Sequence, residues 1–346
     1  MTQIIFIVSA FILTYSGVRI FRHWSLRRKI LDVPNERSSH TVPTPRGGGL
    51  VIVLVCLLFY TVYGFFIARS FSFGYFAGAV LIAVVSWFDD LKSVPWALRF
   101  LIHAVGAALA IFALGYWEKI YLPIAGEINL GLIGTTVTFL WIVWLTNAYN
   151  FMDGIDGIAG TQGWTAGIGW LLTGLLFELE TTALLGGVLA ASCLGFLKHN
   201  WQPAKIFMGD VGSAFLGFTF AVIPLFAANE IQSSGGGGGA RQYQFAPAAI
   251  LLVWLFVFDT LYTFFRRLLR GEKFWQAHRS HLYQRLVISG YSHEFVTILY
   301  GALSFITLSA VLYWLAGENT PEALPPFLVF GIGAGIIVLC YSRENG

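Results

Sequence analysis

Side chains that can bind cations and phosphate groups gather in four short blocks of this sequence. Each block comes at or after the end of a long apolar run, and the four occupy Asp89–Asp90, Asn147–Asp156, Asn200–Asp210 and His278–Arg285. Carboxylate and amide oxygens suit Mg²⁺, and basic side chains suit phosphate oxygens. Together they provide the groups needed for phosphoryl transfer, in which positioning and charge neutralisation supply most of the catalysis.

Asp89 and Asp90 stand side by side at the end of an apolar run. Two adjacent carboxylates repel each other unless a cation or a proton relieves the repulsion. Acidic residues at the C-terminal end of a helix also oppose the helix dipole, so capping of their own helix does not explain the pair. The alternative is an acidic pair that only marks the membrane boundary. Lys92 and Arg99 follow closely in the sequence.

The second block spaces amide and carboxylate groups by three residues, with Asn147, Asn150, Asp153 and Asp156 in order. If the backbone is helical there, the first three share one face. Mg²⁺ usually keeps several waters and takes one or two protein ligands, so the block is sufficient for a magnesium site. A helix cap followed by glycine turns would explain one amide and one carboxylate, but not all four groups.

Asp210 in the third block lies after Phe207 and before another apolar run. Capping the next helix is the simpler role for a lone aspartate, but the flanking aromatic and basic residues favour a binding site. The fourth block offers cationic and hydrogen-bonding groups suited to phosphate oxygens. Its alternative role is a basic patch whose side chains extend to the membrane interface.

A fifth polar segment, residues 32–49, follows the first apolar run and ends in Gly47, Gly48 and Gly49. Its prolines and glycines exclude a regular helix, and adjacent glycines allow close approach of the backbone to an anion. The alternative is a solvated loop whose basic residues hold anionic lipid headgroups.

The composition indicates which elements must position these blocks. Of 346 residues, 57% are hydrophobic and 11% are charged, with a mean hydropathy of +0.71. Soluble domains have roughly 25% charged residues, so a water-soluble core is excluded. A spanning helix needs about 20 mostly apolar residues. Eleven segments are predicted to span: 3–18, 50–68, 73–88, 96–115, 132–149, 162–178, 181–197, 212–228, 246–265, 294–316 and 323–341, with a tight hairpin at 178–182.

The distribution of basic residues predicts the orientation of this bundle. With the N-terminus outside, the inside loops contain 18 of the 21 Lys and Arg residues, and only Arg69, Lys119 and Arg241 lie outside. Basic residues concentrate in cytoplasmic loops. We therefore expect an all-α, polytopic membrane helix bundle of about eleven transmembrane helices, with the N-terminus outside, the C-terminus cytoplasmic and every chemical block on the cytoplasmic face.

Residues 1–346 are expected to form a single membrane domain. Its external loop, residues 229–245, contains Gly235–Gly239 and is predicted to be flexible. The three cysteines lie within apolar runs and are expected to be buried without disulfide or metal partners. Inside the predicted helices, His103 is expected to be a hydrogen-bonded interior residue, and Asp259 has no assigned role.

The blocks resemble those of the polyprenyl-phosphate N-acetylhexosamine-1-phosphate transferases, of glycosyltransferase 4 type. The resemblance rests on Asp89-Asp90, Asn147-Ala-Tyr-Asn150 with Asp153-Gly-Ile-Asp156-Gly, Phe207-Met-Gly-Asp210-Val-Gly-Ser, and the loop His278 to His281, all in the family's order. It implies that a polyprenyl phosphate attacks the β-phosphate of a UDP-N-acetylhexosamine. The products are a polyprenyl-pyrophosphoryl sugar and UMP, and Mg²⁺ is the cofactor, with Mn²⁺ as the alternative ion.

The resemblance also implies a role for each matching residue. Asp89, Asp90 and Asp210 are the implied catalytic residues, the first two as base or electrostatic organiser for the lipid phosphate. Asp210 and Asn150 are the implied metal ligands. Contacts with uridine or sugar are implied for Asp153, Asp156, Asn200 and Phe207, the last by stacking on uracil. Pyrophosphate contacts are implied for Arg99, His278, Arg279 and His281.

The last loop differs from the muramoyl-pentapeptide branch of the family, which has consecutive histidines where this chain has His278-Arg279-Ser280-His281. Together with residues 34–47, it resembles the branch that starts O-antigen or other surface polysaccharides. The expected donor is UDP-GlcNAc or a 6-deoxy sugar such as UDP-FucNAc or UDP-QuiNAc, and the expected acceptor is undecaprenyl phosphate at the bacterial inner membrane. Membrane lipid and a second copy of the chain are further candidate partners, and nucleic acid is not.

Two other functional classes are open at this point. An ion-coupled transporter also contains acidic residues within the membrane, but these normally lie near helix midpoints, whereas the present ones lie at predicted cytoplasmic ends. A non-catalytic scaffold would tolerate Asp210→Asn, whereas loss of a metal ligand should cost an enzyme several kcal/mol of charge stabilisation.

Overall fold

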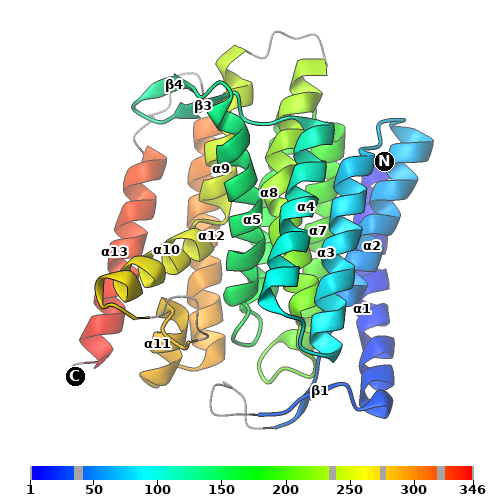
Figure 1. Ribbon diagram of the computed structural model, residues 1–346, viewed down its shortest axis with the longest axis vertical. Coiled ribbons are helices and arrows are strands. Elements are labelled where there is room, and N and C mark those ends of the chain that lie inside the picture. The colour runs from blue at the N-terminus through cyan, green and yellow to red at the C-terminus, as the bar shows by residue number, and fades with distance from the viewer. Residues whose placement is uncertain (1, 35–41, 234–238, 273–277, 318–323, 345–346) are drawn as a thin grey trace.

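The computed structural model describes residues 2–34, 42–233, 239–272, 278–317 and 324–344, most of which are helical (Figure 1). The long helices are α1 (Thr2–Arg28), α2 (Gly49–Val62, continued by a π-helical turn at Tyr63–Ile67), α3 (Phe73–Leu91), α4 (Trp96–Leu114), α5 (Ile133–Phe151), α6 (Ile158–Leu176), α7 (Glu180–Asn200), α8 (Asp210–Ser233), α12 (His293–Ala316) and α13 (Leu324–Glu344). Three shorter helices, α9 (Phe245–Leu252), α10 (Trp254–Leu269) and α11 (Leu282–Ile288), lie between α8 and α12.

Among the described residues, length and composition allow eight helices to cross a membrane, and up to nine if the bent pair α9–α10 counts as one span. The helices α5 and α6 are not among them, because threonine, asparagine and glycine residues lower their hydropathy; α6 is moreover largely enclosed by other helices. The predicted all-α polytopic membrane fold is confirmed. The total of eleven spans and the orientation of the termini stay predictions.

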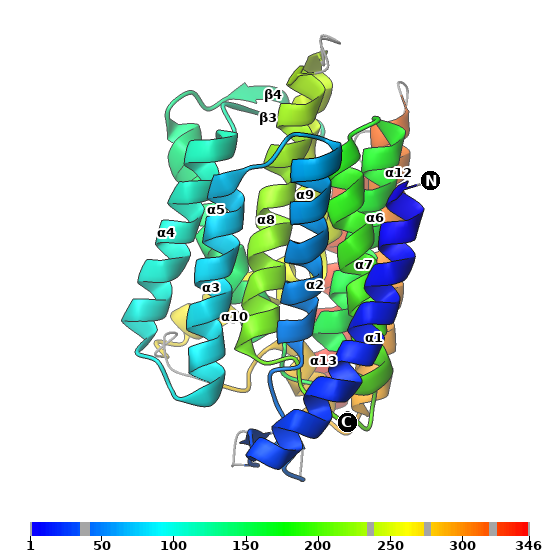
Figure 2. The same cartoon turned by 90° about the vertical axis from the view of Figure 1, so that its right-hand side faces the viewer.

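The two ends of the chain lie at opposite ends of the bundle (Figure 1). Figure 2 shows α1 running obliquely along the bundle, where it contacts α7. The predicted hairpin between α6 and α7 is confirmed, because α6 ends at Leu176, α7 begins at Glu180, and the Leu179 N–H donates to the Gly174 carbonyl over 2.7 Å. The segments that join α1 to α2, α3 to α4, α5 to α6 and α7 to α8 consequently lie at one end of the bundle.

The predicted span 246–265 is not one straight helix. The chain breaks at Val253, and α10 turns away from the helical segment Gln242–Leu252 by 67°. A backbone carbonyl that loses its helical N–H partner at such a break needs another hydrogen-bond donor, because the membrane interior contains no water. The buried Gln162 supplies it: its Nε2 donates to the Leu252 carbonyl over 2.9 Å, and Ser304 Oγ donates to its Oε1 over 3.0 Å.

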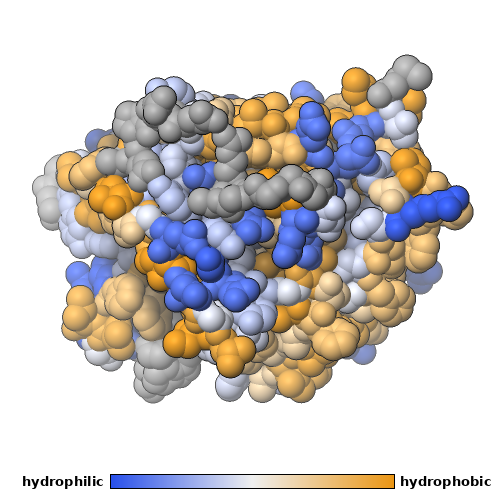
Figure 3. Space-filling model, turned by 90° about the horizontal axis from the view of Figure 1, so that it is seen from above, coloured by the Kyte–Doolittle hydropathy of each residue, from blue (hydrophilic) through white to orange (hydrophobic). Residues whose placement is uncertain are grey.

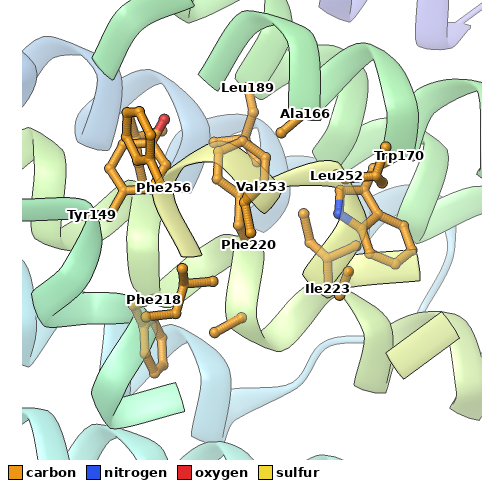
Figure 4. Close-up of a cluster of buried hydrophobic side chains, with 14 of the residues drawn as sticks. Tyr149, Ala166, Trp170, Leu189, Phe218, Phe220, Ile223, Leu252, Val253 and Phe256 are labelled. Carbon is orange, nitrogen blue, oxygen red and sulfur yellow. The ribbon is translucent and has the colours of Figure 1, made fainter. Parts of the chain in front are cut away.

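Small residues allow the central helices to pack closely, as is common between helices in membranes. A Cβ atom on Gly167 of α6 would lie 2.7 Å from the Ala190 nitrogen of α7, so only glycine fits at that crossing. Large aromatic rings fill the remaining core, where Tyr149 packs edge-on against Phe256 at 4.9 Å (Figure 4). Leu252 and Val253 lie within the same cluster, so the helix break is inside the protein core.

The end of the bundle opposite the chemical blocks is more structured than the sequence indicated. A hairpin of β3 (Lys119–Leu122) and β4 (Gly126–Asn129) joins α4 to α5, and α8 continues to Ser233, into the predicted loop 229–245. A 3₁₀ helix begins at Gly239, while 234–238, and so most of the glycine run, lie outside the described residues. Seen from above, hydrophilic side chains gather toward the middle of the molecule and hydrophobic ones surround them (Figure 3).

Candidate active site

Asp90 of α3 holds the first turn of α8. Its Oδ1 accepts the Asp210 N–H over 2.9 Å and its Oδ2 accepts the Val211 N–H over 3.1 Å, with the carboxylate fully buried. The free N–H groups and positive dipole at a helix start favour such an anion. Gly209 makes the approach possible, because it has φ +77° and a Cβ there would lie 2.5 Å from Asp90 Oδ2. Asp90 was predicted to be catalytic, and its geometry is that of a cap which positions Asp210.

Arg46 connects Asp90 to Asp210. Its Nε lies 2.7 Å from Asp90 Oδ1 and its Nη2 lies 2.9 Å from Asp210 Oδ1. Burial acts to lower the pKa of Arg46, but the charges of Asp210 and Asp90 outweigh it and hold that pKa well above its usual range. The guanidinium is therefore charged and uses its planar fork to bind two carboxylates at once.

The segment before α2 fixes Arg46 against the Asp210 block. The strand β1 (Leu31–Asp32) pairs with β2 (Thr44–Pro45), and the Pro45 carbonyl accepts the Phe207 N–H over 2.8 Å. Gly48 and Gly49 then donate to the carbonyls of Phe207 and Met208, so the N–H groups of these two glycines bind backbone and not an anion. Their lack of side chains lets one backbone lie against another. Residues 35–41, which include Asn35–His40, lie outside the described residues.

Asp89 faces Arg99, in the first turn of α4, rather than Arg46. Asp89 Oδ2 forms an ion pair with Arg99 Nη1, and its Oδ1 accepts the Val94 N–H over 2.6 Å. The same Arg99 atom lies 3.2 Å from Asp210 Oδ2. Two arginines therefore neutralise three acids at the adjoining ends of α3, α4 and α8. The predicted proximity of Asp89, Arg99 and Asp210 is present in the structure.

Asp153 and Asn150 lie at the end of α5, beside this cluster. The Asn150 Nδ2 donates to Ser213 Oγ over 2.9 Å, and its amide also interacts with Asp210. Asp153 lies two residues beyond the helix, and its carboxylate makes no ion pair or hydrogen bond with the described residues. Burial, followed by the charge of Asp210, raises the pKa of Asp153 to about 7. Its oxygens are thus available for a ligand, and a bound cation would favour their ionised form.

Asp156 and Asn200 connect neighbouring loops. Asp156 Oδ2 accepts the Ala204 N–H over 3.0 Å, and its Oδ1 lies 3.6 Å from His293 Nδ1. Asn200 accepts the Gly157 N–H and donates to the Ile206 carbonyl, both over 2.9 Å. Its amide is buried. These contacts give both residues a role in holding the loops 152–157 and 201–209 together, whereas their predicted contact with uridine or sugar is untested.

Phe207 is half-buried between the Arg46 segment and the Asp210 block, with both of its backbone polar groups bonded to residues 45–48. This location is beside the acid cluster, as predicted for a residue that contacts the nucleotide. Whether its ring stacks on uracil is untested. His103, in contrast, is buried in α4 one helical turn after Arg99, and its ring interacts with the side chain of Asn147.

The fourth block forms a turn before α11. His278 and Arg279 are half-buried, and His281 is buried with its ring 5.0 Å from that of His278. Burial, reinforced by the charges of His281 and nearby arginines, lowers the pKa of His278 to about 4, so His278 is neutral at pH 7. Tyr283 connects this turn to the second block, because its hydroxyl donates to the Phe151 carbonyl over 3.1 Å.

The donor set is compatible with Mg²⁺, although no group of three or more His, Cys, Asp or Glu side chains arranged to hold a metal occurs in the described ranges. Mg²⁺ needs only one or two protein oxygens when phosphates and water complete its shell. Asp210, with its carboxylate 21% exposed and Asn150 beside it, meets that requirement. The residues Asp210 and Asn150, predicted as ligands, therefore fit the ion.

Two residues of this site were not assigned from the sequence. Arg46 appeared only as part of the glycine loop, although a single arginine directly before three glycines on the predicted cytoplasmic side was a usable signal. Asp259 had no assigned role, and it lies against His281 with Oδ1 3.1 Å from His281 Nδ1. Neither the contacts of Arg46 with Asp90 and Asp210 nor the contact of Asp259 with His281 follows from sequence spacing, because the partners are more than 20 residues apart.

Known proteins are similar to this chain along nearly its whole length. A family described as glycosyl transferase family 4 matches residues 72–228. The decaprenyl-phosphate N-acetylglucosaminephosphotransferase of Mycobacterium leprae (strain TN) is 30% identical over 98% of this chain and 90% of its own length. The chain belongs to glycosyl transferase family 4. It is a polytopic membrane member, and the predicted family is confirmed.

Further relatives place the chain within the family. The probable undecaprenyl-phosphate N-acetylglucosaminyl 1-phosphate transferase of Bacillus subtilis (strain 168) is 30% identical over 91% of this chain and 88% of its own length. The phospho-N-acetylmuramoyl-pentapeptide-transferase of Chloroflexus aurantiacus (strain ATCC 29366 / DSM 635 / J-10-fl) is also 30% identical, but over 63% of this chain and 65% of its own length. This family member is therefore a polyprenyl-phosphate sugar-phosphate transferase from outside the muramoyl-pentapeptide branch, and the transporter alternative has no support.

Proposed function

We propose that this protein transfers N-acetylglucosamine 1-phosphate from UDP-GlcNAc to undecaprenyl phosphate, releasing UMP, at the cytoplasmic face of the bacterial inner membrane. The observation that supports it most is the joining of Asp89, Asp90 and Asp210 by Arg46 and Arg99 at one end of the bundle. The names of the Mycobacterium leprae and Bacillus subtilis relatives both specify N-acetylglucosamine. The lipid product would begin a surface polysaccharide such as O-antigen.

The reaction exchanges one phosphorus–oxygen bond for another. A phosphate oxygen of the lipid forms a bond to the β-phosphorus, and the bond from that phosphorus to the bridging oxygen of the α-phosphate breaks, so UMP leaves with the electron pair. Asp210 and Asn150 would hold Mg²⁺, which neutralises charge on the transferred phosphoryl group when it is bound. The partly exposed side chain of Asp210 is compatible with this role.

The protein's own groups orient the two phosphates. Arg99, 31% exposed and bonded to both Asp89 and Asp210, can exchange a carboxylate for a phosphate oxygen. Asp89 then lies at the position where the lipid phosphate must be organised, while the buried Asp90 keeps Asp210 and Arg46 in place. Asp153, whose carboxylate forms no hydrogen bond within the described ranges, is available to the nucleotide or sugar.

A donor panel tests the proposal. Purified protein in undecaprenyl-phosphate micelles with Mg²⁺ is given UDP-GlcNAc, UDP-FucNAc or UDP-QuiNAc, and UMP release is followed. We expect UDP-GlcNAc to have the highest kcat/KM, and EDTA to abolish the reaction. Preference for a 6-deoxy donor would replace the proposed sugar but keep the reaction class. No UMP from any donor, or undiminished turnover by Asp210→Asn, would overturn the proposal.

A further inference from the structure

Asp259 is the buried carboxylate of α10 that no step above uses. It is 1% exposed and lies within the membrane-length bent pair, where an unpaired charge would be very costly. Five groups bond to it: the N–H groups of Leu282 and Tyr283, the hydroxyls of Thr263 and Tyr300, and the His281 ring. Such a complete set of donors makes Asp259 a fixed anion beneath the turn 278–281.

The contact with His281 determines how that ring is held. Asp259 Oδ1 lies 3.1 Å from His281 Nδ1. Because an ionised carboxylate only accepts hydrogen bonds, Nδ1 must carry the proton, and Nε2 is left as the second ring nitrogen. Nε2 forms no hydrogen bond with the described part of the chain. One side of the ring is thus anchored and the other is available.

The groups around His281 favour an anionic ligand at Nε2. The ring of His278 lies 5.0 Å from that of His281, the cations Arg266 and Arg267 contact the adjacent Ser280, and Arg279 is a near neighbour in sequence. Tyr283 stacks on His281 at 5.9 Å and hydrogen bonds to Phe151, next to the second block. Asp259 is the carboxylate in contact with the ring.

We propose that Asp259 is a positioning residue that acts through His281: it keeps a proton on Nδ1 and, as a counter-charge, stabilises the doubly protonated ring when the sugar nucleotide binds, so that the Nε2–H donates to a diphosphate oxygen. This inference rests on the proposed function for its ligand. It assigns no bond-making step to Asp259, which contacts no reacting atom. It predicts that Asp259 matters for donor binding only while His281 is present.

The first experiment needs no turnover. Nitrogen-15 NMR of ¹⁵N-histidine-labelled protein, with the His281 signals identified by their loss in His281→Gln, shows which ring nitrogen bears the proton at pH 8. We expect the Nδ1–H form in the wild type and in Tyr300→Phe, which removes a bond to the other carboxylate oxygen, and a mixture in Asp259→Asn. A wild-type ring protonated on Nε2 alone would overturn the inference, even if no variant of Asp259 folds.

The second experiment is a double-mutant cycle with UDP-GlcNAc. In the wild-type background, Asp259→Asn should raise KM about tenfold or more, with a smaller effect on kcat. In the His281→Gln background, the same substitution should raise KM by less than about twofold. Asp259→Glu should recover part of the loss. Equal effects of Asp259→Asn in both backgrounds would mean a purely structural cap for α11 and would overturn the inference. If wild type releases no UMP, the proposed function fails while the NMR result still decides the tautomer.

Discussion

At the residue scale, Asp89 and Asp90 are adjacent in sequence but have different partners. Asp90 is fully buried and binds the first N–H groups of α8 and Arg46, whereas Asp89 is partly exposed and binds Arg99. Two adjacent carboxylates would repel each other in isolation. Here each pairs with a different arginine, and the two arginines supply the positive charge that relieves the repulsion. One acid supports the site and the other is accessible within it.

This division predicts different outcomes for two matched substitutions. Asp90→Asn should destabilise the protein by about 3 kcal/mol, because it breaks a buried ion pair and places an amide hydrogen against a backbone N–H. Asp89→Asn should cost less than about 1 kcal/mol but lower kcat about 100-fold, since its ion pair is partly solvated. Thermal unfolding in detergent and initial rates separate the two effects. Equal loss of stability in both variants would contradict the assignment.

The raised pKa of Asp153 predicts that the stabilisation of the protein by Mg²⁺ depends on pH. Its carboxyl has a pKa of about 7 in the folded, metal-free protein, against 3.8 ordinarily, so folding takes up a proton between those pH values. Its contribution to stability therefore falls as pH rises from 4 through 7. Because a cation beside Asp210 favours the ionised form, the melting-temperature increase caused by Mg²⁺ should be larger at pH 8 than at pH 6.

The control for this coupling is Asp153→Asn. We expect Mg²⁺ to raise its melting temperature by nearly the same amount at both pH values, because the titrating carboxyl is gone. Calcium or sodium at matched ionic strength accounts for general charge screening. A wild-type Mg²⁺ effect that decreases with pH would contradict the placement of Asp153 beside the cation.

The sequence identified most of the residues that meet at the site, but not their individual partners. Carboxylates at segment ends on one predicted face indicated a cluster, and Asp89, Arg99 and Asp210 do meet. Asp156 and Asn200 hold two loops together, and Arg46 connects two carboxylates. These roles depend on contacts between residues far apart in the sequence. Such contacts have no periodicity in the sequence, so residue type and spacing could not reveal them.

At the element scale, the break between α9 and α10 places Asp259 and the turn 278–281 beside α5 and the second block. Residues 248–258 are all apolar and include no proline or glycine, so hydropathy predicted one continuous span across Val253. The break is stabilised by a distant group, Gln162 of α6, which satisfies the freed Leu252 carbonyl. Hydropathy thus located nearly every helix but could not detect a bend whose cause lies in another helix.

Gln162→Leu tests this explanation. Removal of the amide leaves the buried Leu252 carbonyl without its donor, which should cost about 1–3 kcal/mol. Ser304→Ala is the matched control, since it removes only the hydroxyl that donates to Gln162 and keeps the bond to Leu252. We expect the control to lose clearly less stability in thermal unfolding. A Gln162→Leu protein as stable as wild type would mean that the break does not depend on this hydrogen bond.

At the scale of the whole molecule, the site exists because successive helices return every chemical segment to one end. The excess of basic residues predicts that this end faces the cytoplasm. An impermeant maleimide should therefore label Lys92→Cys from the cytoplasmic side and Glu127→Cys, in β4, from the opposite side. The three native cysteines are buried and provide a low background. Labelling of both positions from one side would contradict the orientation.

The most direct test of the central claim follows the β-phosphate itself. Purified protein is incubated with Mg²⁺, undecaprenyl phosphate and UDP-GlcNAc labelled with ³²P in the β-phosphate, and the lipid is extracted. Transfer of sugar 1-phosphate predicts that the label moves into the lipid together with the sugar while unlabelled UMP remains in water, and that Asp210→Asn prevents this. Label recovered in water as UDP, with an unlabelled glycolipid, would contradict the account.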